Sequence, residues 1–259
     1  MNEGAQGIVK ESLVVRPRLC PESPAWATYC PGCQEPLVSR IIADTLEELG
    51  VDGRAIMLIG VGCHAFMGFC MNLDGVGCCH GRAPDLATAM KRVYPNAVVF
   101  TIQGDGDCVS IGAGPLIGAL TRGEKITIIM FNNANYGTTG GQLAPTTLVG
   151  QKTSTTPDGR NANREGYSVH TAELVTTFKS VAYSARGAVN TAANYRRTKG
   201  YVKTAFQKQI DNIGPSFVEI LTACPPNWRL SPVDCLKWVE EKMIVEFPLG
   251  EFKNVDHIE

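Results

Sequence analysis

The segment 104–106, which reads Gly-Asp-Gly, is the feature that most constrains this chain. Residues 97–102 and 126–131 are apolar runs rich in β-branched residues, as is typical of buried parallel strands. Asp105 lies three positions after the first run, and Asn133 lies 28 positions further on, beyond the second run. Open α/β sheets bind ligands at the carboxyl ends of their strands. The spacing therefore predicts a ligand site at one edge of a parallel sheet.

The residue types at this predicted edge are those that hold a diphosphate through a divalent metal. Mg²⁺ prefers oxygen ligands in near-octahedral geometry, so a carboxylate, an amide oxygen and a backbone carbonyl match the protein's share. Gly104 and Gly106 have no Cβ, so the backbone can turn sharply and approach a phosphate. A single Gly-Asp-Gly is also ordinary turn chemistry. The prediction therefore depends on both halves together, each after a strand.

Length and charge set the class of protein. With 259 residues the chain can form one large α/β domain, with or without arms. The net charge is −1 and 19% of residues are charged, which argues against nucleic acid or anionic lipid as a partner. The sequence has no apolar run of about 18 residues, and its polar first residues do not resemble a signal peptide. We expect a soluble, cytoplasmic protein with no membrane contact.

The chain has ten cysteines, which is many for a cytosolic protein. Because disulfides are rare in the cytosol, this number indicates metal binding. Cys30 and Cys33 form a CxxC pair, and Cys63 and Cys224 follow strand-like runs, residues 55–59 and 216–221, at the predicted ligand edge. Thiolates suit a tetrahedral zinc ion or an iron–sulfur cluster, and a thioredoxin-like dithiol is a third interpretation. The dithiol is disfavoured because this CxxC does not lie between a strand and a helix of a βαβ unit.

The remaining periodicity predicts the fold. Apolar residues at helical spacing predict helices over residues 34–49, 84–93, 111–122, 195–210 and 232–243. Their alternation with strands predicts an α/β fold with a doubly wound, mostly parallel sheet. Residues 143–164 are polar and aperiodic, which predicts a long surface or interface loop. We expect an N-terminal arm (1–23), a cofactor domain (24–224) and a C-terminal tail (225–259) that packs on a partner subunit.

Six stretches in the same order resemble the β subunit of 2-oxoacid:ferredoxin oxidoreductases, the thiamine-diphosphate enzymes that oxidise 2-oxoacids to acyl-CoA. They are YCPGC at 29–33, GVGC at 60–63, HGRA at 80–83, GDGD at 104–107, NN with YGTTGGQ within 132–142, and VEIL leading to Cys-Pro within 218–225. The sequence after residue 224 is most similar to the bacterial branch assigned to 2-oxoisovalerate or 2-oxoglutarate.

This resemblance implies the cofactors thiamine diphosphate and Mg²⁺ and one 4Fe–4S cluster, each with its own ligands. The cluster ligands would be Cys30, Cys33, Cys63 and Cys224, and the Mg²⁺ ligands Asp105, Asn133 and the carbonyl of Asn135. The diphosphate would be lined by Gly104, Gly106, Asp107, Tyr136, Gly137, Thr138 and Thr139. His80 and Arg82 are candidates to hold the cofactor or the substrate carboxylate; the alternative is that they belong to an ordinary solvated turn. His64 is a candidate to face the substrate; the alternative is an ordinary hydrogen-bonded histidine in a loop.

Three residues depart from the family pattern without removing a ligand: Gln34, His64 and Thr138. They bear on the substrate pocket. A histidine can donate a hydrogen bond or a charge, which favours a polar substrate such as 2-oxoglutarate. Apolar Phe66 and Met67 favour a branched side chain. We expect a branched-chain 2-oxoacid such as 2-oxoisovalerate, with 2-oxoglutarate as the alternative.

The resemblance also implies partners. The glutamate that activates thiamine diphosphate in this superfamily belongs to a pyrimidine-binding domain, here expected on an α subunit, and the family adds γ and δ subunits, CoA and ferredoxin. The isolated chain is therefore expected to be inactive. Two alternatives remain open: a zinc-stabilised diphosphate-binding subunit without redox function, and a non-oxidative thiamine decarboxylase, which has no use for four clustered thiols.

Overall fold

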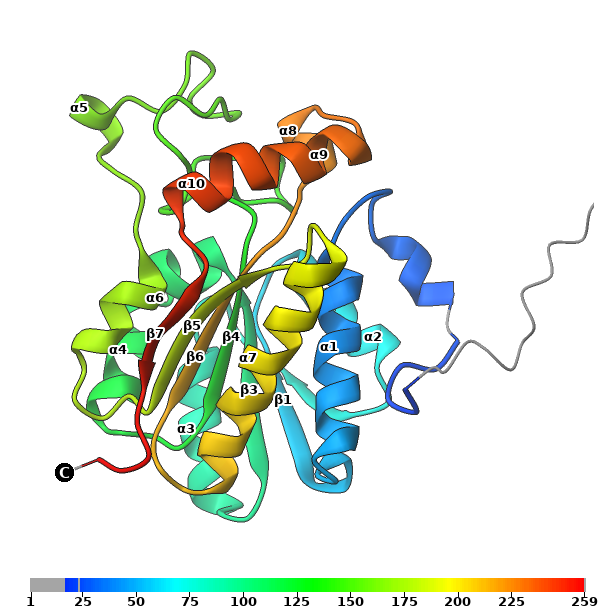
Figure 1. Cartoon of the computed structure of the whole chain (residues 1–259), viewed down its shortest axis with the longest axis vertical. Coiled ribbons are helices and arrows are strands. Elements are labelled where there is room, and N and C mark those ends of the chain that lie inside the picture. Colours follow the sequence, from blue (N-terminus) through cyan, green and yellow to red (C-terminus); the bar gives the residue numbers. More distant parts are fainter. Residues whose placement is uncertain (1–16, 23, 259) are drawn as a thin grey trace, which may run out of the picture.

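The computed structural model describes residues 17–22 and 24–258, so the predicted N-terminal arm lies mostly outside the described residues. The described chain forms a seven-stranded sheet with the order β2-β1-β3-β4-β6-β5-β7 (Figure 1). The strands are β1 (Ala55–Ile59), β2 (Asp74–Gly77), β3 (Val98–Gly104), β4 (Thr127–Asn132), β5 (Tyr183–Ala188), β6 (Ser216–Leu221) and β7 (Gly250–Asn254). All pairings are parallel except that of β7, which runs antiparallel to β5.

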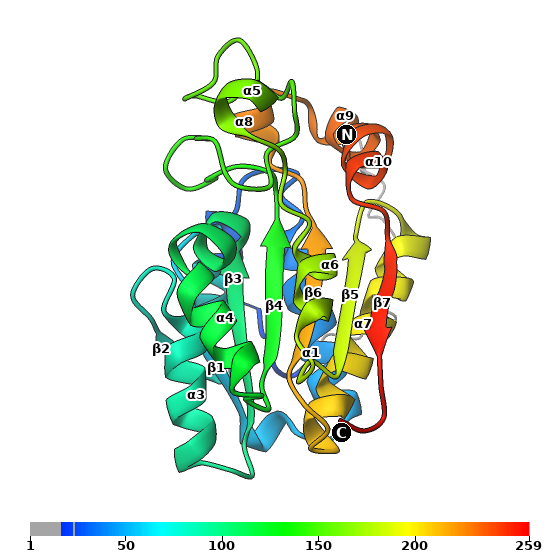
Figure 2. The same cartoon turned by 90° about the vertical axis from the view of Figure 1, so that its left-hand side faces the viewer.

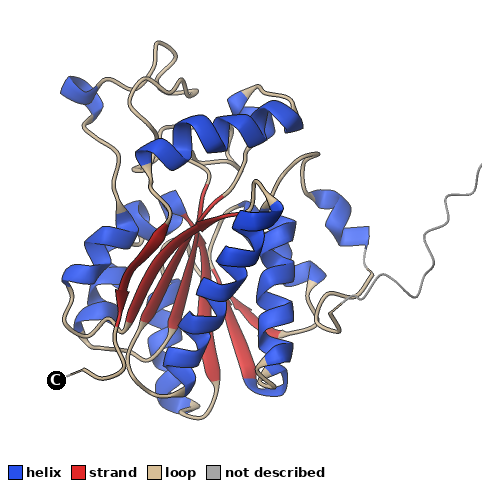
Figure 3. Ribbon diagram, viewed as in Figure 1, coloured by secondary structure: helices blue, strands red, loops and turns tan. Residues whose placement is uncertain are grey.

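Helices cover both faces of the sheet, as Figure 3 shows by colour. One face carries α1 (Glu35–Glu48) and α7 (Ala192–Ile210), and the other carries α3 (Ala83–Val93), α4 (Ala113–Thr121) and α6 (Thr171–Leu174) (Figures 1 and 2). Each layer has its own apolar core, one beneath α1 and α7 and one beneath α3 and α4. The prediction of a doubly wound, mostly parallel α/β sheet is confirmed.

The central strands are buried on both faces. Every residue of β4, β5 and β6 is buried, which agrees with the apolar runs that predicted β4 and β6. The predicted helix over 34–49 is observed as α1, with Pro36 in its first turn and Gly50, at φ 64°, just after its end. The predicted helix over 111–122 is shorter: a π-helical turn, η5 (Asp107–Ile111), precedes α4.

Short elements fill the loops. They are η2 (Pro24–Thr28), η3 (Asp52–Arg54), η4 (Cys63–Phe66), α2 (Met67–Cys70), α5 (Ala162–Glu165), η6 (Val175–Thr177) and α8 (Pro225–Trp228). The predicted long loop over 143–164 is observed up to α5. Within the described ranges, no helix has both the length and the apolar character needed to cross a bilayer.

The C-terminal segment packs on this chain's own domain. Its helical part consists of α9 (Pro232–Trp238), η7 (Val239–Met243) and α10 (Ile244–Glu246). Cys235, Met243 and Phe247 form a third apolar cluster with Ala134 and Leu221 from the sheet edge. The tail then enters the sheet as β7, a strand that the sequence did not predict. Packing of this tail on a partner subunit stays a prediction.

Candidate active site

The predicted site residues gather at one edge of the sheet. Strands β1, β3, β4 and β6 are parallel neighbours and end at the same edge, toward which the arrowheads of β4 and β6 point in Figure 2. His64 follows β1, Asp105 follows β3, Asn133 follows β4 and Cys224 follows β6. Segments that are far apart in the sequence therefore line two neighbouring cavities at this edge.

The first cavity, the cofactor cavity, contains the predicted metal and diphosphate residues. It is lined by Glu35, Val61, Gly62, Cys63, His64, His80, Gly104, Asp105, Gly106, Asp107, Asn133, Asn135, Tyr136, Gly137, Thr138 and Thr139. A Cβ added at Gly106 would lie 2.1 Å from the ring of Tyr136, so this wall requires a glycine. All predicted diphosphate residues and two of the three predicted catalytic residues meet here.

Asp105 is a buried carboxyl group at the bottom of the cofactor cavity. Its Oδ1 accepts a hydrogen bond from the Gly106 amide at 2.8 Å, and its Oδ2 accepts one from the hydroxyl of Thr146. Burial raises the pKa of Asp105 to about 7 despite these hydrogen bonds. A divalent cation would favour the charged form, so the donor set fits Mg²⁺.

The loop after β4 contributes two asparagines to the same cavity. Ala134 has a positive φ of 55°, and its amide donates to the Asn132 Oδ1 at 3.0 Å. Asn133 and Asn135 flank this residue on the cavity wall. The Asn135 Oδ1 accepts from Asn227 Nδ2 at 3.2 Å, so its side chain already has a partner. This is compatible with a metal contact through the Asn135 carbonyl.

Asp107 anchors the wall of the cavity. Its Oδ1 contacts His80 Nδ1 at 2.5 Å and accepts the Gly81 amide at 2.7 Å, while Gln103 donates to its Oδ2 at 2.9 Å. The carboxylate therefore orients the His80 ring. Arg82 does not line this cavity. Its half-exposed side chain lies 3.8 Å from Asp85 at the start of α3, so a catalytic role for Arg82 gains no support from this chain.

His64 faces the cofactor cavity in a buried setting. Its side chain is enclosed, its ring stacks on Phe131 at 5.9 Å, and its Nε2 has no hydrogen-bond partner among the described residues. Burial lowers its pKa to about 4, although Asp107 acts in the opposite direction. The imidazole is therefore neutral at pH 7.

The second cavity, the cysteine cavity, is lined by all four predicted cluster ligands, Cys30, Cys33, Cys63 and Cys224. Burial raises the pKa of Cys63 to about 11 and also raises the pKa of Cys33 and Cys224. Thiols in such a setting ionise when a metal binds them. Among the described residues, no group of three or more His, Cys, Asp or Glu side chains is gathered closely enough to hold a metal ion.

Three site residues were missed or left without a role by the sequence. Glu35 lines both cavities; burial raises its pKa to about 8, with Asp105 adding to the shift, and its Oε2 has no partner. In the sequence it resembles an ordinary acidic residue of a first helical turn. Thr146 lies in an aperiodic loop that gave no signal. Gln34 accepts the Ala223 amide at 2.9 Å and so links the CxxC segment to the loop of Cys224.

Comparisons with known proteins agree with this arrangement. Residues 60–220 match the family described as thiamine pyrophosphate enzyme, C-terminal TPP binding domain. This match begins at the residue after β1 and ends within β6, so it includes the loops after β1, β3 and β4 that line the cofactor cavity. By class, the chain contains a thiamine-pyrophosphate-binding enzyme domain.

Relatives define the family within this class. The ketoisovalerate oxidoreductase subunit VorA of Methanothermobacter thermautotrophicus is 38% identical over 232 residues, which cover 90% of this chain and 49% of that protein. The 2-oxoglutarate synthase subunit KorB of Archaeoglobus fulgidus is 32% identical over 213 residues, which cover 82% of this chain and 75% of that protein. The chain belongs to the 2-oxoacid:ferredoxin oxidoreductase family. It spans about half the length of VorA.

A solved structure shows the same fold. The 2-oxoglutarate:ferredoxin oxidoreductase from Magnetococcus marinus, with 2-oxoglutarate, coenzyme A and succinyl-CoA bound, superimposes with a TM-score of 0.79. The match covers 93% of this chain and 86% of that chain, at 22% sequence identity. The predicted fold and the resemblance stated from the motifs are both confirmed.

Proposed function

We propose that this chain is the thiamine-diphosphate- and iron–sulfur-binding subunit of a CoA-dependent 2-oxoacid:ferredoxin oxidoreductase. One observation carries the proposal: the cofactor cavity and the cysteine cavity share a wall formed by Glu35, Cys63, Asn133 and Gly137. Oxidative decarboxylation of this kind needs an electron acceptor beside the thiamine cofactor. A wall common to both cavities meets that need.

The chain's own residues have distinct tasks in this proposal. Mg²⁺ would be held by Asp105, Asn133 and the carbonyl of Asn135, and the diphosphate by Gly104, Gly106, Asp107 and residues 136–139. The four cysteines would hold one 4Fe–4S cluster. Bound thiamine diphosphate supplies an electron sink for loss of CO₂, and the cluster accepts electrons. Asp107 orients the His80 ring, and buried His64 excludes water and offers a neutral imidazole at the cavity wall.

We infer a branched-chain 2-oxoacid, such as 2-oxoisovalerate, as the substrate. No lysine or arginine of the described chain lines either cavity, so this subunit offers no cation to a distal carboxylate. His64 is neutral at pH 7, so it also offers no positive charge to a distal carboxylate. The ketoisovalerate relative is more similar to this chain than the 2-oxoglutarate relative, at 38% against 32% identity. The alternative substrate is 2-oxoglutarate, which requires a cation from a partner subunit.

The proposal includes partner subunits. An α subunit would contribute the pyrimidine-binding domain and its activating glutamate, and γ and δ subunits would complete the complex that uses CoA and ferredoxin in the cytoplasm. A zinc-stabilised subunit without redox function is the second candidate. Both candidates would use the same four cysteines, so metal analysis separates them.

The test is to produce the complete complex without oxygen, measure its metals, and assay viologen reduction with each 2-oxoacid, with and without CoA. We expect about four irons per chain for one 4Fe–4S cluster and CoA-dependent reduction that is faster with 2-oxoisovalerate. Zinc without iron would support the second candidate. Release of CO₂ without electron transfer would indicate a non-oxidative decarboxylase. A preference for 2-oxoglutarate would overturn only the substrate assignment.

A further inference from the structure

The loop between β4 and α5 has a buried inner part, although its sequence is polar. Thr146 and Thr147 are fully buried above the sheet edge, and Arg160 is only 5% exposed. Consecutive buried threonines and a buried arginine in a loop need a structural explanation, because each buried polar group requires a partner.

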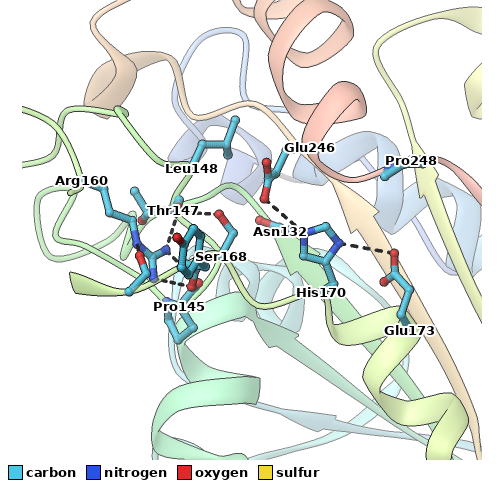
Figure 4. A network of polar contacts seen from close by, with 12 residues as sticks. Asn132, Pro145, Thr147, Leu148, Arg160, Ser168, His170, Glu173, Glu246 and Pro248 are labelled. Carbon is cyan, nitrogen blue, oxygen red and sulfur yellow. Dashed lines mark hydrogen bonds and ion pairs between the residues drawn. The ribbon is translucent and has the colours of Figure 1, made fainter. Parts of the chain in front are cut away.

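All five N–H groups of the Arg160 guanidinium can be assigned to backbone carbonyls. Nη1 donates to the carbonyls of Pro145, at 3.0 Å, and Thr147 (Figure 4). Nε donates to Gly166 at 2.9 Å, and Nη2 donates to Tyr167 at 2.7 Å and Glu165 at 3.2 Å. Within the described ranges, no carboxylate forms an ion pair with this guanidinium. We call this contact set the Arg160 clamp.

The Arg160 clamp fixes the residues on both sides of Thr146, because the carbonyls of Pro145 and Thr147 both accept a hydrogen bond from Nη1 of Arg160. The Thr146 hydroxyl donates to Oδ2 of Asp105. The Thr147 hydroxyl donates to the carbonyl of Ala134 at 2.8 Å. Ala134 lies between the two asparagines proposed to bind Mg²⁺. Two consecutive threonines therefore connect the two halves of the metal site.

We propose that Arg160 is a positioning residue for the Mg²⁺–diphosphate site, acting through Thr146 and Thr147. This inference rests on the proposed function. The clamp sets the carboxylate of Asp105 and the loop around Ala134 at a fixed separation before the metal arrives. Loss of a residue that holds a metal ligand in place typically lowers metal affinity by about 10- to 100-fold.

The test uses the assembled complex after removal of Mg²⁺ by chelation, titrated with thiamine diphosphate at several Mg²⁺ concentrations by calorimetry. Arg160→Lys and Thr146→Val should each raise the Mg²⁺ concentration for half-saturation by about 10- to 100-fold. Thr146→Ser keeps the hydroxyl and should bind like the unchanged protein. The matched control is Arg164→Lys in α5, directly after this loop, whose side chain is 67% exposed and which should show no change. Because both changes act on one contact chain, the double variant Arg160→Lys/Thr146→Val should be no weaker than the weaker single variant.

A normal Mg²⁺ dependence in Thr146→Val would overturn the inference. So would a folded Arg160→Lys that has a lowered unfolding temperature but a normal Mg²⁺ dependence, because the clamp would then serve only the stability of the loop. Asp105→Asn separates this outcome from failure of the proposed function. If Asp105→Asn also binds normally, the metal assignment itself is wrong. If only Asp105→Asn fails to bind, the metal site stands and the positioning role of Arg160 is wrong.

Discussion

Asp105 carries a carboxyl group that the fold buries, and no lysine or arginine of the described residues forms an ion pair with it. Two hydrogen-bond donors, the Gly106 amide and the Thr146 hydroxyl, are enough to orient it. They are not enough to offset the loss of water, since burial still raises its pKa to about 7. The residue is therefore preorganised for a cation.

Asp105→Asn should abolish Mg²⁺-dependent binding of thiamine diphosphate while leaving the iron content unchanged. A pair of unit charges near a protein surface is worth about 4 kcal/mol, so affinity should fall by at least about 100-fold. Isothermal titration of the complex, with iron analysis of the same sample, measures both quantities. Unchanged binding would refute the assignment of Asp105 to the metal.

Individual site residues could be predicted where the residue type and its position in a motif are enough to indicate a ligand. Asp105, Asn133 and the four cysteines follow strands or form a CxxC pair, so pattern alone indicated them. Glu35 and Thr146 were not predictable, because their roles depend on which distant segments they meet. The role of Arg82 stays a prediction: the motif indicated a site residue, and within this chain its side chain lies 3.8 Å from Asp85.

At the scale of elements, β5, β6 and α6 are joined by a buried cation. Arg186 on β5 is fully buried; its Nη1 donates to Glu173 at 2.8 Å, and its Nε lies 2.9 Å from Glu219 on β6. Glu219 also accepts a hydrogen bond at 2.7 Å from Asn132, the last residue of β4, directly before the loop proposed to bind Mg²⁺. His170, between Glu173 and Glu246 in Figure 4, extends this network toward α10.

Glu173→Gln should lower the free energy of unfolding at pH 7 by about 1 kcal/mol, the upper range for a part-exposed ion pair. Burial acts to raise the pKa of Glu173, but the hydrogen bond and charge of Arg186 lower it below its usual value near 4.5. A lowered pKa stabilises the fold above pH 4.5, and this contribution is lost as pH falls through the folded-state value.

Urea unfolding between pH 7 and pH 3.5 measures this effect. The unchanged protein should lose more stability over that range than Glu173→Gln does. Glu241→Gln, which removes the same charge from an exposed position, is the control and should follow the unchanged protein. Equal acid sensitivity in Glu173→Gln and the unchanged protein would contradict the ion-pair role.

Element prediction succeeded where burial and residue type agree. The runs for β1 and β6 match the observed strands, and the periodicity predicted α1 to within one residue at each end. β5 was missed because its sequence, YSARGA, contains a buried arginine and a glycine. Gly187 is needed there because an added Cβ would lie 2.2 Å from Thr198 of α7. Contacts between elements, which no local pattern encodes, determine such a strand.

At the scale of the whole molecule, the cysteine cavity joins segments from almost the full length of the described chain. Cys30 and Cys33 precede α1, Cys63 follows β1, and Cys224 follows β6. The Gln34–Ala223 hydrogen bond closes this arrangement between the first and last of these segments.

Cys224→Ser should lower the iron content and abolish electron transfer while leaving thiamine diphosphate binding largely intact. The thiol lines the cysteine cavity but not the cofactor cavity. Cys235→Ser is the matched control, because Cys235 is buried in the apolar cluster of the C-terminal helices and lines neither cavity. Iron analysis and absorbance near 400 nm compare the two variants. Equal iron loss in both would show that Cys224 is not the fourth ligand.

The shared wall between the two cavities also limits how this site can vary. Gly137 belongs to that wall, and an added Cβ would lie 3.3 Å from both the Cys63 sulfur and the Asn133 Nδ2. Contacts this short require the neighbours to shift, so a side chain at Gly137 would press on a proposed cluster ligand and a proposed Mg²⁺ ligand in one step. If both proposals hold, the cysteine cavity and the cofactor cavity are coupled at this position.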